Sequence, residues 1–104
     1  MSVISVYAVF ADAAEAERIG KTVVDERLAA CVNVLVPIRS IYRWQGQIEQ
    51  ADEVAAIFKT TDASADALIA RIAGLHSYEV PCVTSWPVGK ILPAYAVWVQ
   101  ENVG

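Results

Sequence analysis

A length of 104 residues suits one domain with one modest core, so we expect residues 1–104 to fold as a single unit. Apolar residues make up 56% of the sequence and charged residues only 19%, which leaves more apolar surface than a small core can hide. The net charge of −4 and the singly scattered lysines and arginines argue against nucleic acid or an anionic membrane as a partner.

The sequence also bears on location. No apolar run approaches the length of about 20 residues that a membrane-spanning helix needs. No basic segment precedes the first apolar run, as it would in a signal peptide, and two cysteines are too few for a disulfide framework. We therefore expect a cytoplasmic protein with reduced thiols.

The first predicted elements are a strand and a helix. Val3–Phe10 is almost entirely apolar, which predicts a central strand covered by a helix layer or on both faces. Asp12 and Glu15 stand at the spacing of a helix capping box, and apolar residues then recur at helical spacing. We predict a helix over Ala13–Leu28.

Two long strand-like runs follow, Ala30–Trp44 and Gln47–Thr60, and only Gln45 and Gly46 separate them. Gly46 supplies the positive φ that a two-residue hairpin turn requires. Pro37 cannot donate a ladder hydrogen bond and predicts a bulge or an edge position. The apolar and aromatic side chains of the first run share one parity, the period-two signature of a strand: Val32, Val34, Val36, Ile38, Tyr42 and Trp44.

The hairpin predicts an assembly. The turn places Arg39 opposite Asp52, a favourable charge pair, and the bulge is expected to shift the register beyond them. At roughly 3.3 Å per residue, each arm would extend about 45–50 Å, whereas a compact chain of this size has a radius of gyration of only about 13 Å. The hairpin should therefore protrude, and its exposed edges should pair with a neighbouring subunit.

The second half of the chain predicts helix, strand and helix. Asp62 or Ser64 can cap a helix that ends near Gly74, and Val80–Val88 reads as an edge strand because it contains two prolines. A short helix over Ala94–Asn102 closes the chain. The order of elements predicts an α+β, ferredoxin-like split βαβ fold (βαββαβ) with a C-terminal helix and a long protruding hairpin.

Two stretches hold candidate ligands or catalytic groups. Cys31 is a soft metal ligand or redox thiol, or else a small buried apolar residue. His76, Tyr78 and Glu79 lie in a loop after the second helix and could form a ligand or acid–base cluster. In the alternative interpretation this loop is a turn in which Tyr78 packs and His76 is solvated.

A third stretch carries alternating aromatic residues. Tyr42 and Trp44 are predicted to lie in a subunit contact, because Tyr, Trp and Arg are common interface anchors. Lys59 could bind an anion or extend its ammonium group to solvent. The sequence contains no Cys-x-x-Cys, His-x-x-x-His, glycine-rich phosphate loop or Gly-x-Ser-x-Gly motif, so it lacks the standard signatures of zinc, nucleotide and hydrolase sites.

Taken together, these motifs resemble the CutA family of divalent-cation tolerance proteins. The matching segments cover nearly the whole chain in the order of the family: Glu26–Asn33, Ser40–Gly46, Glu53–Thr60, His76–Pro81, Tyr95 and Trp98. The resemblance implies a tight homotrimer whose long hairpins pair between subunits, similar in architecture to PII signalling proteins. We expect no enzyme activity, because no second convergent acid or nucleophile accompanies His76 or Glu79 in the sequence.

The resemblance further implies a response to copper or another divalent metal, with Cys31 and His76 as metal ligands. Two such ligands fall short of a tetrahedral site, so the expected binding is weak. In the alternative, a PII-like sensor binds a small anion in an intersubunit cleft that contains Lys59, Tyr78 and Glu79. An enzyme with His76 or Glu79 as a general base and a purely structural scaffold are two further alternatives.

Overall fold

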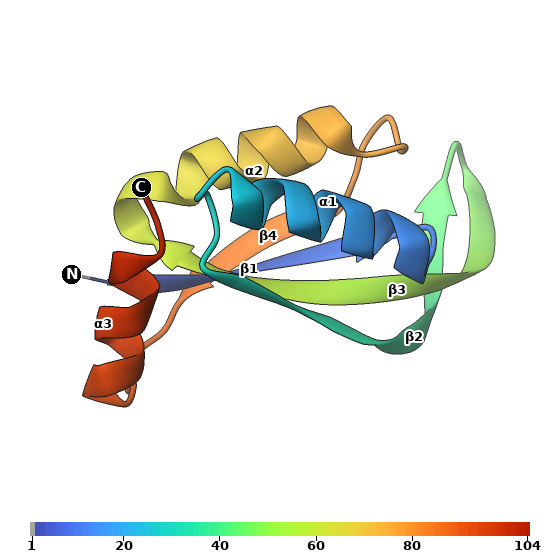
Figure 1. The fold of residues 1–104 in the computed structure, drawn as a ribbon. Coiled ribbons are helices and arrows are strands. Elements are labelled where there is room, and N and C mark those ends of the chain that lie inside the picture. The colour runs from blue at the N-terminus through green and yellow to red at the C-terminus, as the bar shows by residue number, and fades with distance from the viewer. Residues whose placement is uncertain (1) are drawn as a thin grey trace.

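The computed structural model describes residues 2–104 and contains a four-stranded antiparallel sheet with two helices on one face and the C-terminal helix apart from them at one end of the sheet (Figure 1). The elements are β1 (Val3–Phe10), α1 (Ala13–Asp25), β2 (Cys31–Trp44), β3 (Gln47–Thr61), α2 (Asp62–Leu75), β4 (Val83–Pro87) and α3 (Pro93–Glu101). The strands lie in the order β2–β3–β1–β4, with β1 central and β4 at an edge. This arrangement confirms the predicted α+β, ferredoxin-like fold.

The main core lies between the sheet and helices α1 and α2. Alternate residues of β1 enter it, and Phe10 packs against Phe58 of β3 with ring centroids 6.3 Å apart. Helix α1 contributes the predicted apolar stripe, and α2 contributes Leu68 and Ile72, which are fully buried. A smaller cluster joins Val3 to α3. The core therefore accounts for the nearly continuous apolar character of the first strand.

The hairpin turn and its register confirm the sequence prediction. Gln45 and Gly46 adopt φ angles of 49° and 80°, as a two-residue turn of the primed type requires. Arg39 lies opposite Asp52, and its Nε atom is 3.2 Å from the Asp52 carboxylate. Both side chains are well exposed, so this ion pair contributes little to stability.

A bulge near Pro37 changes which side chains share a face. Val34 pairs with Ala56 and Pro37 with Val54, so β2 takes three steps where β3 takes two. Directly opposed residues of an antiparallel pair project from the same face. Before the bulge, even-numbered residues of β2 project from the same face of the sheet as the core-facing residues of β3. After the bulge, even-numbered residues of β2 project from the same face as Glu53. The even-numbered apolar and aromatic residues of β2 therefore do not all lie on one face.

The hairpin bends instead of extending straight from the sheet. Figure 1 shows the distal part of β2 and β3 turning at the bulge toward the loop that follows α2. The longest dimension of the described chain is consequently 45 Å, about the length predicted for one straight arm. The distal arm is nevertheless exposed, and Val36 retains 79% of its accessible surface.

Helix α1 ends at Asp25 and not at Leu28 as predicted. Arg27 adopts a left-handed conformation with φ of 60°, and the N–H groups of Arg27 and Leu28 donate to the carbonyls of Val24 and Val23. This pattern is a Schellman motif, in which a left-handed residue stops the helix. The Arg27 guanidinium also donates to the carbonyl oxygens of Glu101 and Gly104, which fastens the end of α3.

Boundaries of the later elements also differ from the predictions. Neither Asp62 nor Ser64 is the N-cap of α2: Thr61 occupies that position without a side-chain bond, and Asp62 already lies in the first turn. Strand β4 begins at Val83 instead of Val80, which leaves one of the two prolines outside the ladder. Helix α3 starts one residue early, with Pro93 in the first turn. No helix within residues 2–104 is long and apolar enough to cross a membrane.

Candidate functional site

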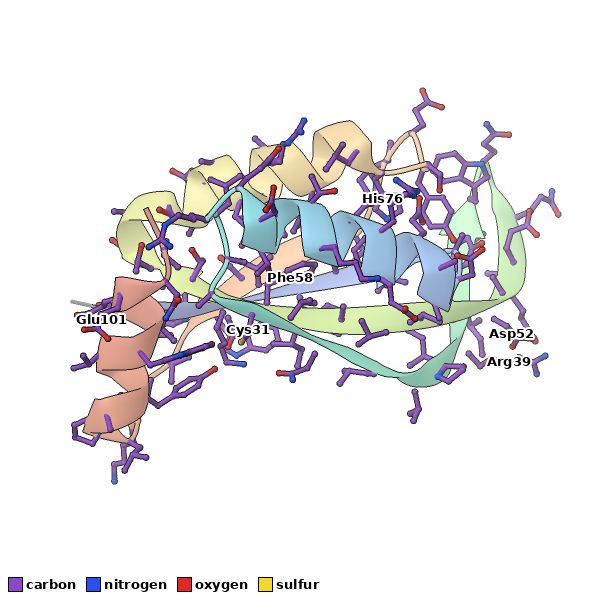
Figure 2. All side chains as sticks on the ribbon, in the orientation of Figure 1. Cys31, Arg39, Asp52, Phe58, His76 and Glu101 are labelled. Carbon is purple, nitrogen blue, oxygen red and sulfur yellow. The ribbon has the colours of Figure 1, made fainter. Side chains whose placement is uncertain are left out.

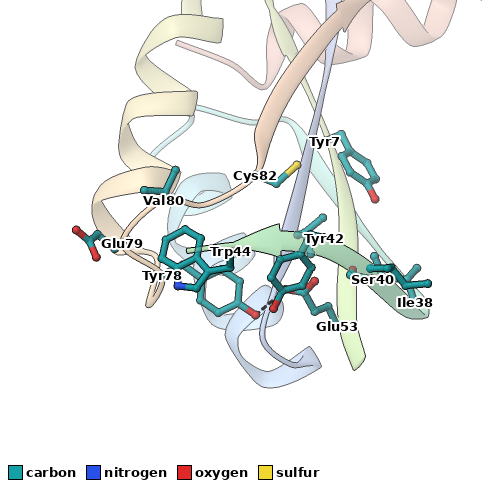
Figure 3. A pocket seen from close by; sticks show the side chains of 12 residues that line it. Tyr7, Ile38, Ser40, Tyr42, Trp44, Glu53, Tyr78, Glu79, Val80 and Cys82 are labelled. Atoms are coloured by element: carbon teal, nitrogen blue, oxygen red, sulfur yellow. Dashed lines mark hydrogen bonds between the residues drawn. The ribbon is translucent and has the colours of Figure 1, made fainter. Parts of the chain in front are cut away.

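A pocket of about 560 Å³ lies between the bent hairpin, the end of β1 and the loop that follows α2. Its aromatic wall comes from three parts of the chain, with Tyr7 on β1, Tyr42 and Trp44 on β2, and Tyr78 in the loop (Figure 3). Glu53 of β3 also lines it. The pocket exists because the bulge directs the distal β2 residues to the same face as Glu53.

Glu53 is the buried polar group of this pocket, with 8% of its surface exposed. The Tyr78 hydroxyl donates a hydrogen bond of 2.7 Å to its Oε2 atom. Burial and then this bond raise the pKa of Tyr78 above its ordinary value, so the phenol keeps its proton and remains the donor. The Tyr78–Glu53 bond therefore connects the loop to β3.

His76 supports the loop from behind the pocket. Its ring stacks on Phe10 at a centroid distance of 5.0 Å, and its Nε2 atom lies 2.7 Å from the carbonyl oxygen of Val9. Its Nδ1 atom accepts the backbone N–H of Tyr78 at 3.0 Å. Nε2 must therefore carry the ring proton and donate it to Val9. Both nitrogens are engaged, which makes His76 a structural support for Tyr78.

Glu15 fastens the same loop to α1. Its Oε2 atom accepts the backbone N–H of Ser77 at 2.9 Å, and its Oε1 atom accepts that of Ala11 at 3.1 Å. Asp12 caps the helix as predicted, because its side chain accepts the Glu15 N–H at 2.8 Å. Burial alone would raise the pKa of Glu15, but the bonds from Ser77 and Ala11 lower it below its ordinary value.

Cys31 lies in a separate environment. Its Sγ atom is 3.4 Å from the hydroxyl of Tyr95, whose ring stacks on Trp98. Burial and the contact with Cys31 raise the pKa of Tyr95 to about 12. Lys59 is the β3 residue that pairs with Cys31, so it belongs to this region and does not line the pocket.

The structure does not bring Cys31 and His76 together within one chain (Figure 2). Cys31 pairs with Lys59, which pairs with Ser5 of β1, whereas His76 contacts Val9. Four residues along a strand span about 13 Å. Within residues 2–104 there is no group of three His, Cys, Asp or Glu side chains placed to hold a metal ion. The described part of one chain thus supplies no complete set of ligands for a metal centre.

Of the predicted cleft residues, Tyr78 and Glu79 line the pocket and Lys59 does not. The predicted contact residues Tyr42 and Trp44 also line it, and they keep 41% and 42% of their surfaces exposed. The sequence pattern did not single out Glu53, although a carboxylate next to the apolar run Val54–Phe58 was an available signal. It identified Glu15 only as a capping residue.

Comparison with known proteins shows to which family the chain belongs. The family model described as CutA1 divalent ion tolerance protein matches residues 4–102. A divalent-cation tolerance protein CutA from Thermotoga maritima is 40% identical over 100 residues, which are 96% of this chain and 98% of that protein.

Solved structures of similar proteins have the same fold. The crystal structure of CutA from Xylella fastidiosa has a TM-score of 0.96 at 36% identity and covers 100% of both chains. A CutA structure from Archaeoglobus fulgidus, described as a periplasmic divalent cation tolerance protein, has a TM-score of 0.94 at 35% identity and covers 98% of this chain and 99% of that one. The chain belongs to the CutA1 family of divalent ion tolerance proteins.

Proposed function

We propose that this protein acts in divalent-metal tolerance as a cytoplasmic homotrimer that binds copper or a similar divalent ion only weakly. The observation that carries the proposal is the family match over residues 4–102. The net charge of −4 supports an attraction for cations. The wide separation of Cys31 from His76 supports weak binding, because neither residue has enough ligands beside it.

Two features support the trimer. Strands β2 and β4 are the outer strands of the sheet, and each presents a backbone edge that another chain can pair with. The distal hairpin carries exposed apolar side chains, among them Val36 and Ile41. A head-to-tail contact that closes after three copies would cover both edges without forming a filament.

The assembly is tested by sedimentation at low micromolar concentration. We expect a particle of three times the chain mass of 11.3 kDa. The double substitution of Tyr42 and Trp44 by alanine should shift the protein toward smaller species, because it removes two large exposed anchors of the hairpin. Leu92→Ala, which removes an exposed apolar side chain outside the hairpin, is the control and should leave the mass unchanged. A well-ordered single-chain particle in the unsubstituted protein would refute the assembly.

Metal binding is tested by calorimetric titration of the native protein with Cu²⁺ and Zn²⁺. We expect weak binding of copper, reduced by Cys31→Ser and by His76→Gln and abolished by the combination. To bind copper, His76 must give up its bond to Val9 or to the Tyr78 N–H, which is a further reason to expect weak binding. The matched control is Cys82→Ser, which removes the other free cysteine. Thermal unfolding of each variant identifies any loss that comes from disturbing the bonds of His76. If the double variant kept the copper affinity, these residues would not be the ligands.

The alternative function, recognition of a small anion between subunits, receives little support from the pocket of a single chain. Glu53 and Glu79 line that pocket, and no lysine or arginine does. An anion site would need Lys59 of another copy to approach Tyr78. The alternative therefore stays a prediction about the assembly.

A further inference from the structure

Helix α3 is apolar on more than one side but packs against its own chain on only one. Val99 is fully buried in the cluster that contains Val3 and Ala30. Val97 and Trp98 point elsewhere and keep 51% and 41% of their surfaces exposed. A helix that is apolar all round is normally enclosed by protein. The exposed side of α3 therefore needs a cover that the described part of one chain does not supply.

A cation lies beside this exposed side of α3. Lys59 is directly opposite Cys31 in the sheet, so the two side chains project from the same face. Cys31 contacts the hydroxyl of Tyr95 on α3, and the Tyr95 ring stacks on Trp98 at a centroid distance of 5.7 Å. None of the ion pairs formed within residues 2–104 includes Lys59. The α3 end of the sheet thus presents aromatic surface together with an unpaired ammonium group.

The other end of the molecule presents aromatic surface with the opposite charge. Figure 1 shows α3 at one end of the sheet and the bent hairpin at the other. The aromatic pocket at the hairpin end is lined by Glu53 and Glu79 and by no lysine or arginine. Glu53 is buried, and its bond from Tyr78 comes from a neutral phenol. No ion pair within the described residues balances the Glu53 charge.

The two unpaired charges cannot meet within one chain. Glu53 and Lys59 both belong to β3 and project from the face opposite the core residues Val54 and Phe58. Six residues of strand separate them by about 20 Å, well beyond the reach of an ion pair. A pair between them can therefore form only between copies. Such a contact joins two different surfaces of identical chains, so it is head-to-tail and can close into a ring.

We propose that the α3 end of one copy covers the aromatic pocket of the next, with Trp98 against the aromatic wall and Lys59 paired with Glu53. This inference rests on the proposed trimer and specifies which two surfaces meet in it. Tyr42 and Trp44, the predicted contact residues of the hairpin, line the same pocket and belong to the same interface. In this arrangement Lys59 is engaged by a carboxylate and is not available to a small anion.

The pairing of charges is tested by a double-mutant cycle on the stability of the assembly. Sedimentation over a dilution series, at a fixed urea concentration that half-dissociates the unsubstituted trimer, measures association. Lys59→Met keeps the length of the side chain, and Glu53→Gln keeps an acceptor for the Tyr78 hydroxyl. We expect each to raise the protein concentration of half-dissociation at least tenfold, because it leaves the other charge unpaired. The double variant should be no weaker than the weaker single variant.

Matched substitutions on α1 serve as controls. Lys21→Met and Glu17→Gln remove the same charges from exposed positions of that helix and should leave association unchanged. Trp98→Ala should also raise the concentration of half-dissociation at least tenfold, because it removes the large aromatic side chain that covers the pocket. Far-ultraviolet circular dichroism shows whether each variant keeps the fold.

Unchanged association in both single variants, or strictly additive losses in the double variant, would overturn this contact and leave the trimer standing. A single-chain particle in the unsubstituted protein would refute the trimer and this contact with it. If a variant did not fold, zero-length carbodiimide cross-linking of the unsubstituted protein decides. Mass spectrometry should then find Lys59 of one copy joined to Glu53 or Glu79 of another. Links from Lys59 only to carboxylates outside the pocket would overturn the proposal.

Discussion

Glu15→Ala is expected to destabilise the protein by about 3 kcal/mol at neutral pH, because hydrogen bonds to a charged group contribute about 1.5–3 kcal/mol each. Glu15 is buried, and its carboxylate accepts the backbone N–H groups of Ala11 and Ser77. Alanine would leave both donors without this partner and detach the loop that carries Tyr78. Urea unfolding at fixed protein concentration measures the loss.

The pH dependence of the free energy of unfolding separates the contribution of the Glu15 charge from that of its side-chain packing. Its pKa in the fold lies below the ordinary value of 4.5, so its stabilising contribution is complete above that value and is lost as the pH falls through the folded pKa. Glu15→Gln should therefore destabilise the protein most at neutral pH and progressively less in acid. Glu17→Gln, an exposed charge removal on the same helix, is the control. An equal loss at all pH values would contradict the assignment.

Gly20→Ala is expected to destabilise the fold by about 1–2 kcal/mol, although alanine is the better helix former by up to about 1 kcal/mol. A Cβ atom at Gly20 would lie 2.8 Å from Cγ1 of Val32, so α1 could not keep its approach to β2. Gly74→Ala in α2 is the matched control, because a Cβ there meets no atom within 4 Å, and it should be neutral or stabilising.

A double-mutant cycle locates the cause of that loss. In the background of Val32→Ala the methyl group at position 20 has room, so Gly20→Ala should cost at least about 1 kcal/mol less than in the unsubstituted protein. The free energies of unfolding of the four proteins give the coupling directly. If Gly20→Ala stabilised the protein as much as Gly74→Ala does, the close approach of α1 and β2 would not limit packing.

The elements that follow local chemistry could be predicted from the sequence. The apolar run of β1, the Gly46 turn and the pairing of Arg39 with Asp52 depend on neighbouring residues and on period two, and the structure confirms them. The predicted end of α1 was wrong, because Arg27 adopts a left-handed conformation that is typical of glycine. The sequence pattern does not reveal such an exception.

The candidate site was predicted in its parts and not in its arrangement. Tyr42, Trp44, Tyr78 and Glu79 stood out individually, and the bend of the hairpin brings them around one pocket. Glu53 did not stand out, because its place beside these aromatic residues depends on a one-residue offset between two strands. The proline in β2 indicated where an irregularity would occur and not how many residues it would contain.

The positions of Lys59 and Glu53 are a second case in which the sequence pattern does not predict which residues lie close together. They belong to one strand and share its parity, so period two alone places them on one face. Six residues of strand nevertheless separate them by about 20 Å. Sequence reasoning grouped Lys59 with Tyr78 and Glu79 by their chemical types, whereas the structure places Lys59 next to Cys31.

The extra residue in β2 has a consequence for how such a chain can change over generations. Deleting either Leu35 or Val36 would remove the bulge, so that β2 and β3 have equal numbers of residues between their pairs. Every β2 side chain beyond that point would then project from the opposite face of the hairpin. Tyr42 and Trp44 would then turn away from Glu53 with no change in their own codons. A three-base deletion could thus remove the pocket in one event and leave the framework of the sheet intact.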